Sequence, residues 1–192
     1  MEPTATAVSG GVVALRLDLV DRAARGDVEA FEQLVLAGSD RTFRIARAIL
    51  GNDADARDAV QEVYVSAWRE LPRLRDHQRF DAWLRRITVN ACRAGLRDRR
   101  RVREISLDVR EIDRADPDKD LQQHFGDTEA LSRAFDRLDA AKRTILVLHY
   151  LEGESVASIA ASLQIAPGTV KWRLSEARAA LSRALTAEGA PR

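Results

Sequence analysis

The chain has 192 residues, of which 45% are hydrophobic and 32% are charged, a composition typical of a globular protein. Its net charge of only +1 excludes a polycation that binds nucleic acid through bulk charge. A single cysteine excludes an internal disulfide framework and a multi-cysteine zinc site. No apolar run approaches a membrane span and no signal-peptide layout opens the chain, so we expect a cytoplasmic protein without membrane insertion.

Charge is nevertheless segregated along the chain. The segment from Arg93 to Arg103 holds six arginines and one acid, whereas the segment from Asp108 to Asp120 holds six acids and three bases. The basic segment is a candidate for contact with nucleic acid, because clustered cations supply the electrostatic part of that binding.

The first half of the chain reads as a series of helices. Residues 1–14 are small and weakly polar, and they predict a disordered N-terminus. From Leu15 onward, apolar residues recur at helical spacing. Gly26 and Asp27 break the first helix and cap the next, while Gly51 ends a third helix and precedes a fourth that runs to about Leu71.

After Pro72, a polar loop over 73–79 leads into a helix from Phe80 to about Arg101. This helix completes a first domain over 15–101. Residues 102–126 contain scattered acids and no sustained apolar period, which indicates a flexible acidic linker.

A second helical domain is predicted over 127–186, followed by a short tail over 187–192. Its last part has the pattern of a helix-turn-helix. A short helix over 155–163 is followed by a turn over 164–168, and a second helix runs from Thr169 to about Leu185. The fold class is therefore all-α, with two small helical domains joined by a flexible linker.

The second helix of this motif is the one that enters the major groove of DNA. Val170, Leu174 and Ala177 share its apolar face and leave polar and cationic residues on the rest of its surface. Its first turn is expected to meet base edges, and the flanking cations to meet phosphates. The residues predicted to contact DNA are Thr169, Lys171, Trp172, Arg173, Ser175 and Arg178.

Two helices of the first domain carry polar stripes. On the helix around 55–68, Asp58, Gln61 and Glu62 form a mostly acidic stripe that suits a basic partner helix. The helix that begins at Phe80 carries an asparagine within a row of arginines, which is suited to reading a base while the cations hold the backbone. The residues of this second stripe are Arg86, Asn90, Arg93 and Arg97.

Three sequence motifs together resemble a known family. They are Asp-Ala-x-Asp-x-x-Gln-Glu-x-aromatic-x-x-Ala-Trp, then Phe-x-x-Trp-Leu-x-Arg-Ile-x-x-Asn, and Gly-Thr-Val-Lys-x-Arg-Leu near the end. In this order, over about residues 17–101 and 128–186, they resemble a bacterial RNA polymerase sigma factor of the extracytoplasmic-function (ECF) group, in the sigma-70 family.

The resemblance implies that the protein binds core RNA polymerase and directs promoter-specific initiation. The residues that would dock on the clamp helices of the β′ subunit are Asp55, Asp58, Gln61 and Glu62. Those that would open and read the −10 element are Leu74, Arg75, Asp76, His77, Arg86, Asn90, Arg93 and Arg97. The C-terminal helix would read the −35 element. Further implied partners are the β flap of the polymerase and an anti-sigma protein.

Some positions depart from the family pattern. Arg57 stands where an acid is usual, Leu74 where an aromatic is frequent, Trp172 where a small residue is usual, and Glu176 where an arginine is common. The preferred promoter sequence is therefore expected to differ from a standard consensus.

The alternative is a helix-turn-helix regulator that binds DNA without being a polymerase subunit, and it leaves both stripes of the first domain unexplained. An enzyme is not expected: the three histidines are scattered, no phosphate loop is present, and no catalytic, metal or cofactor residue is predicted.

Overall fold

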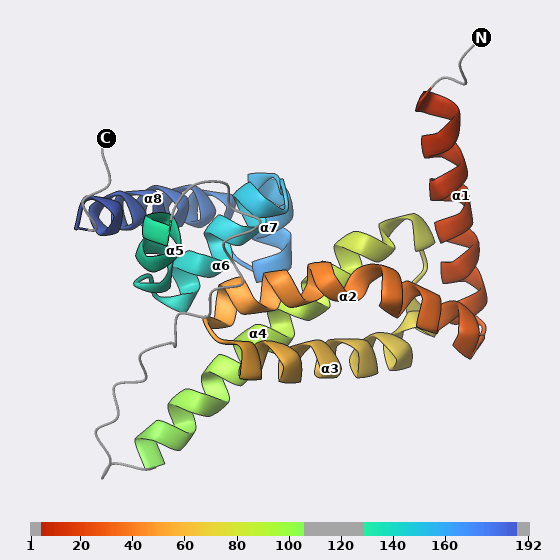
Figure 1. Cartoon of the computed structure of the whole chain (residues 1–192), viewed down its shortest axis with the longest axis horizontal. Coiled ribbons are helices and arrows are strands. Elements are labelled where there is room, and N and C mark those ends of the chain that lie inside the picture. Colours follow the sequence, from red (N-terminus) through yellow and green to blue (C-terminus); the bar gives the residue numbers. More distant parts are fainter. Residues whose placement is uncertain (1–4, 106–128, 188–192) are drawn as a thin grey trace.

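The computed structural model describes residues 5–105 and 129–187, and within these ranges it contains helices and no strand (Figure 1). The first half comprises α1 (Ala5–Ala24), α2 (Val28–Leu50), α3 (Asp53–Glu70), the short 3-10 helices η1 (Leu71–Arg73) and η2 (His77–Arg79), and α4 (Phe80–Ile105). The second half comprises α5 (Glu129–Asp136), α6 (Ala140–Leu146), the π-helical turn η4 (Val147–Leu151), α7 (Val156–Leu163) and α8 (Pro167–Ala187). The predicted all-α class is confirmed.

Three boundaries in the first half differ from the expectation. α4 runs to Ile105, so residues 102–105 of the expected linker are helical, and the rest of that segment, 106–126, lies outside the described residues. α1 begins at Ala5, so residues 5–14 are helical, and the prediction of a disordered N-terminus is wrong for them. The second and third predicted helices form one continuous helix, α2, which runs through Gly38. Gly38 is buried within it, and a Cβ there would lie 2.9 Å from the hydroxyl of Tyr64. This glycine therefore allows α3 to approach α2 and does not end the helix.

The turn of the helix-turn-helix is shorter than the sequence indicates. α8 begins at Pro167, two residues before the predicted start, because proline is favoured in the first turn of a helix, where its missing N–H is not needed. Gln164 ends α7 in a left-handed conformation, with φ of 56°. The N–H of Ile165 donates to the carbonyl of Ala160 at 3.1 Å, which closes the end of α7.

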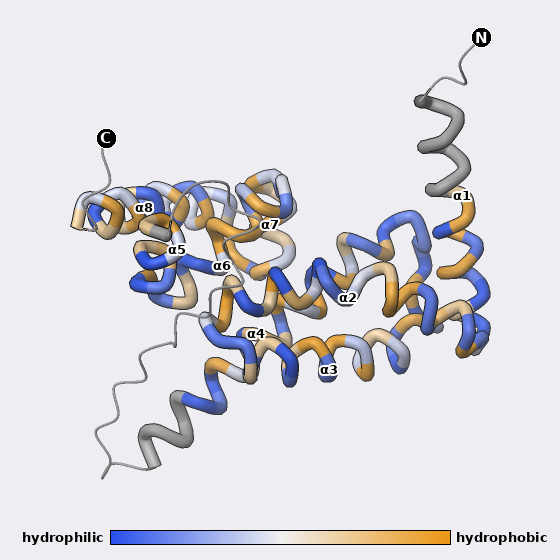
Figure 2. The backbone as a smooth tube through the Cα atoms, in the orientation of Figure 1, coloured by the Kyte–Doolittle hydropathy of each residue, from blue (hydrophilic) through white to orange (hydrophobic). Residues whose placement is uncertain are grey.

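Helix starts are fixed by the capping residues that the sequence offers. Asp27 accepts a hydrogen bond from the N–H of Ala30, as predicted, and Asn52 and Ser155 cap α3 and α7 in the same way. Hydrophobic and hydrophilic residues alternate along α2 and α3 (Figure 2), as expected for helices with one buried face. No described helix, within 5–105 and 129–187, has the length and apolar character required to cross a membrane.

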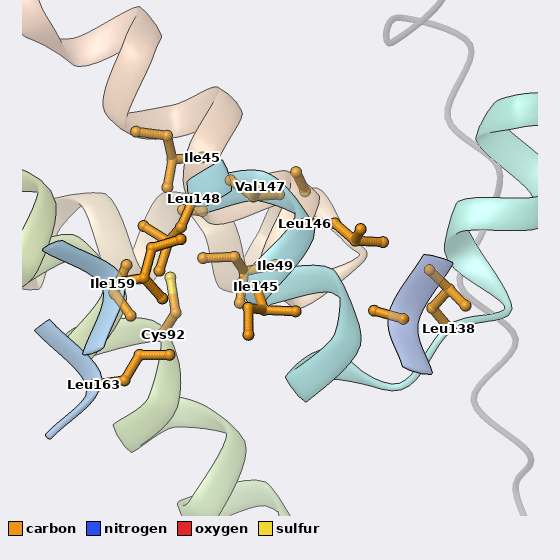
Figure 3. Close-up of a cluster of buried hydrophobic side chains, with 14 of the residues drawn as sticks. Ile45, Ile49, Cys92, Leu138, Ile145, Leu146, Val147, Leu148, Ile159 and Leu163 are labelled. Carbon is orange, nitrogen blue, oxygen red and sulfur yellow. The ribbon is translucent and has the colours of Figure 1, made fainter. Parts of the chain in front are cut away.

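The buried side chains form two clusters. One lies entirely within the first half, where α1, α2, α3 and α4 meet. The other spans both halves of the molecule (Figure 3), and we call it the shared core. Its members from α2 and α4 are Ile45, Ala46, Ala48, Ile49, Leu50, Val89 and Cys92, with Ala56 from α3. Its members from the second half are Leu138, Ile145, Leu146, Val147, Leu148, Ile159, Ala160, Leu163, Val170, Leu174 and Ala177.

Cys92 lies in this shared core and is fully buried, next to Ile159 and Leu163 (Figure 3). Burial raises the pKa of its thiol to about 12, so the sulfur remains protonated at neutral pH. The cysteine is therefore a packing residue.

A buried arginine joins the two halves beside the shared core. Arg143 of α6 donates from Nε to the carbonyl oxygen of Ile49 at 3.0 Å, and so satisfies the end of α2. Gly51 has φ of 85°, and a Cβ there would lie 2.9 Å from Nη1 of Arg143. Burial lowers the pKa of the Arg143 guanidinium, and it raises the pKa of the nearby Asp136 carboxyl.

Candidate nucleic-acid interface

The exposed face of α8 carries the predicted DNA contacts. Val170, Leu174 and Ala177 are buried, as the apolar spacing predicted, and they anchor the helix to the shared core. Thr169, in the first turn, is half-buried. The exposed residues among the candidates are Lys171, Trp172, Arg173, Ser175 and Arg178.

Trp172 is 62% exposed, which is unusual for an indole. It therefore belongs to the presented surface of α8 and not to the core. Arg178 is held differently from the other cations, because its guanidinium carbon lies 5.6 Å from the centre of the Tyr150 ring. The structure thus ties Arg178 to η4, two turns beyond the residues at the start of α8.

The polar stripe of α4 is exposed along its length. Arg86, Asn90, Arg93 and Arg97 follow one another at spacings of four, three and four residues, so they share a face. The opposite side of α4 is anchored by Leu84, Thr88 and Cys92, which are buried. The stripe therefore presents three cations and one amide to solvent from a rigid helix.

The loop residues predicted to read DNA are held by contacts within the protein. Leu74 packs partly against the core of the first half, which removes much of its side chain from the surface. His77 pairs with Asp21 of α1. Asp76 caps η2 by accepting from the N–H of Gln78, and it pairs with Arg79 at 3.1 Å. Arg75 is exposed.

The acidic stripe of α3 splits into two parts. Asp58, Gln61 and Glu62 are exposed, while Asp55 is half-buried. The Asp55 carboxylate accepts from the side chain of Asn52 and pairs with Arg99. Asp55 is thus part of the cap that starts α3, a role that the sequence spacing did not separate from docking.

Two apolar grooves lie near these surfaces. One, of about 690 Å³, runs between α2 and α3 beside Gln61 and is lined by Phe31, Val35 and Trp68 among others. The second, of about 520 Å³, lies between α5, η4 and α8. Its lining residues include Leu131, Phe135, Leu151 and Leu185. Sequence reasoning did not find either groove, because each is made by residues from several helices.

The sequence analysis also missed four charged residues where the two halves meet. Arg41 of α2 pairs with Glu152 at 2.6 Å, and Arg85 of α4 pairs with Glu154 at 3.0 Å. The neighbouring Arg86 was selected for its place in the exposed stripe. Arg85, one position earlier, turns toward the other half of the molecule, and only the tertiary structure gives its partners.

The geometry defines a helical protein with a helix-turn-helix in one half and an exposed basic stripe on a helix of the other, an arrangement typical of proteins that bind DNA. Comparison with known families agrees with this class. The family model of sigma-70 region 2 matches residues 34–102, and that of sigma-70 region 4 matches residues 128–181. The chain belongs to the sigma-70 family, in its ECF group, and it directs promoter-specific transcription initiation with RNA polymerase.

Individual relatives support the assignment. The chain is 34% identical over 160 residues to the ECF RNA polymerase sigma factor SigM of Mycobacterium tuberculosis, covering 83% of this chain and 79% of that protein. It is 30% identical over 177 residues to the RNA polymerase sigma-H factor of Pseudomonas aeruginosa, covering 87% and 92%. Among solved structures, the sigma factor RpoE in complex with the anti-sigma factor NepR from Bartonella quintana gives a TM-score of 0.66 at 26% identity, covering 83% and 98%.

These matches favour the sigma factor over a regulator that acts without polymerase, because both sigma regions are present in one chain. Sigma factors are initiation factors and not enzymes. We call the first half, α1 to α4, the region 2 domain and the second half, α5 to α8, the region 4 domain.

Proposed function

We propose that this sigma factor binds core polymerase and the two promoter elements through three separate surfaces. The exposed stripe of Asp58, Gln61 and Glu62 docks on the β′ clamp helices of core polymerase. The basic stripe of α4 and the loop over 74–77 open and read the −10 element, and the start of α8 reads the −35 element as duplex.

The observation that carries the proposal is the separation of these surfaces. Each lies on a helix whose opposite face is anchored in a core, so each is presented rigidly. The acidic stripe and the basic stripe lie on different helices, α3 and α4, as two partners of opposite charge require. The groove between α2 and α3 adds an apolar surface beside Gln61 that a docked helix can cover.

Two further partners follow from the same geometry. The groove between α5, η4 and α8 is apolar, which suits an apolar segment of the polymerase, and we assign it to the β flap. The RpoE of Bartonella quintana is seen with the anti-sigma factor NepR, and by this likeness we infer an anti-sigma partner that covers the polymerase-binding surfaces. Both interactions take place in the cytoplasm, where the polymerase is found.

The direct test is in vitro transcription with purified core polymerase and a fragmented genomic library, followed by mapping of RNA starts. Starts that share two spaced upstream motifs, and that depend on this protein, are expected. The pair of motifs supplies the −10 and −35 preferences at the same time. Binding of duplex DNA without polymerase, combined with an absence of new starts, contradicts the proposal and favours the regulator.

A further inference from the structure

A small pocket in the region 2 domain, between α1, α2 and α4, has a wall rich in arginine. Its volume is about 190 Å³. Arg16, Arg41 and Arg85 line it, and Asp81 is the single carboxylate among its lining residues. Counted within the region 2 domain alone, these four side chains carry a net charge of +2, which favours an anionic ligand.

In the structure the two domains are in contact, which we call the closed arrangement. In this arrangement the region 4 domain supplies negative charge that offsets the arginines of the pocket. Glu152 Oε2 lies 2.6 Å from Arg41 Nη2 and 3.7 Å from Arg85 Nε, and Glu154 Oε1 lies 3.0 Å from Arg85 Nε. The two glutamate side chains are only 3% and 5% exposed. Ser158 donates to the second oxygen of Glu154 at 2.9 Å and fixes its orientation. Three arginines are then balanced by three carboxylates.

The third arginine retains an unused donor. Arg16 pairs with Asp81 through Nη2 at 2.6 Å and lies over the ring of Phe80. Its Nε is buried and has no hydrogen-bond partner. Because buried donors are nearly always satisfied, this N–H can donate a hydrogen bond to a ligand oxygen.

Guanidinium groups bind carboxylates and phosphates with the same forked geometry, so arginines that hold two carboxylates can hold a phosphate instead. The nearly buried glutamates are stable only while they remain paired. If the two domains separate, Arg41 and Arg85 lose both partners at once, and an external anion can take their place.

Separation of the domains follows from the proposed promoter contacts. Elements centred near −10 and −35 are about 25 base pairs apart, which corresponds to about 85 Å along the DNA. α8, by contrast, packs in the same core as residues of α2 and α4. The closed chain therefore cannot hold both elements, and the domain contact must open when the promoter is bound.

We propose that Arg16, Arg41 and Arg85 form a phosphate-binding site, and that Glu152 and Glu154 compete for it by pairing with Arg41 and Arg85 when the two domains are in contact. When the domains separate, a phosphodiester of the promoter DNA replaces the two carboxylates. The identity of the DNA ligand rests on the proposed function, whereas the anion site and its intramolecular competitor rest on the contacts described above.

The test uses the full chain with both glutamates replaced, Glu152→Gln together with Glu154→Gln, which keeps their shape and removes their charge. Binding of a fluorescent single-stranded oligonucleotide is measured by anisotropy without polymerase, at several salt concentrations. The variant is expected to bind about tenfold more tightly than the unchanged chain, with a salt slope steeper by about 0.7 for one added phosphate contact. Glu29→Gln with Glu32→Gln, at two exposed sites on α2, is the matched control.

Adding Arg41→Gln and Arg85→Gln to the glutamate variant is expected to return the affinity and the salt slope to those of the unchanged chain. Arg25→Gln, at an exposed position after α1, is the control for the loss of an arginine. Far-ultraviolet circular dichroism establishes that each variant keeps its helices. If the glutamate substitutions raise the oligonucleotide affinity equally with and without the two arginines, the proposal is overturned, because opening then exposes some other DNA-binding surface. No gain overturns it as well.

Inorganic phosphate distinguishes the possible sources of the ligand. If millimolar phosphate raises the melting temperature of the glutamate variant and displaces the oligonucleotide, the site takes a free phosphate; if it does neither while the DNA binds, the site takes a phosphodiester. These measurements contain no polymerase. A negative transcription assay therefore does not contradict the anion site, and a negative anion-binding result does not contradict the proposed sigma-factor function.

Discussion

The two domains differ in how their cores are built. The region 2 domain has a core of its own, in which Leu34, Val63 and Leu71 are almost completely buried between four helices. The buried apolar residues of the region 4 domain other than Ala134, in contrast, belong to the core that it shares with α2, α3 and α4. In the closed chain, the smaller domain therefore completes its core with surface from the larger one.

The comparison explains why the contact between the domains includes both apolar and charged groups. Small domains bury a lower fraction of their surface and are correspondingly less stable, so added apolar contact has a large effect. The charged pairs of Arg41 and Arg85 lie at the edge of that contact and can exchange partners. The stripes of α3, α4 and α8 that we propose as binding surfaces lie outside the shared core and remain exposed.

The largest expected effect concerns a residue outside both cores. Glu62→Lys places a cation in the acidic stripe of α3, and like charges across an interface cost several kcal/mol. We expect core-polymerase binding, measured by surface plasmon resonance, to fall by at least about 2 kcal/mol while the free energy of unfolding is unchanged. Glu32→Lys, exposed on α2, is the control. Unaltered affinity in the Glu62 variant contradicts the docking surface.

The junction of the two domains is tested at Gly51, and Gly26, which also has a positive φ but lies away from the junction, is the control. Gly51→Ala forces an alanine into the left-handed region and places its Cβ against Arg143, so we expect a loss of about 2–4 kcal/mol in the free energy of unfolding. Gly26→Ala also forces an alanine into the left-handed region, but its Cβ has no neighbour within 4 Å. It should therefore lower the free energy of unfolding by only about 1–2 kcal/mol. Urea denaturation measures both. Equal losses would show that Arg143 moves aside for the added Cβ without cost.

The exposed surface of the region 4 domain is tested at Lys171. Lys171→Ala is expected to weaken binding of the −35 duplex by about 1–3 kcal/mol if the ammonium contacts a base. Arg183→Ala, exposed near the end of α8, controls for the loss of a cation from this helix. An equal loss on every DNA sequence makes Lys171 a phosphate contact.

The smallest expected effect is a loss of stability at alkaline pH caused by Cys92 in the shared core. The pKa of Cys92 is about 12 in the folded chain against 9.0 for an unperturbed thiol. Its contribution to stability is therefore complete below pH 9 and is lost as the pH rises above 9, at about 1.4 kcal/mol per pH unit. Urea denaturation between pH 9 and 10 should show a steeper loss for the unchanged chain than for Cys92→Ala. Parallel curves contradict burial of the thiol.

Local sequence was sufficient for much of this molecule. Apolar spacing identified the buried face of α8, the cap at Asp27 located the start of α2, and the arginine stripe of α4 is exposed as predicted. These features depend on residues within a few positions of one another, where helix geometry fixes which side chains share a face. The same local motifs carried the likeness to the sigma factors.

Other features were decided only by the tertiary structure. The sequence predicted two helices between Asp27 and Gly51, whereas the structure has a single helix, α2, in which Gly38 is buried against Tyr64. The pairing of Arg41 with Glu152 joins residues 111 positions apart, and Arg143 meets Ile49 across 94 positions. No local pattern encodes such partners, because long-range contacts depend on how all the apolar faces are buried together. The sequence determined the helices and their exposed stripes, and the shared core determined how the two domains meet.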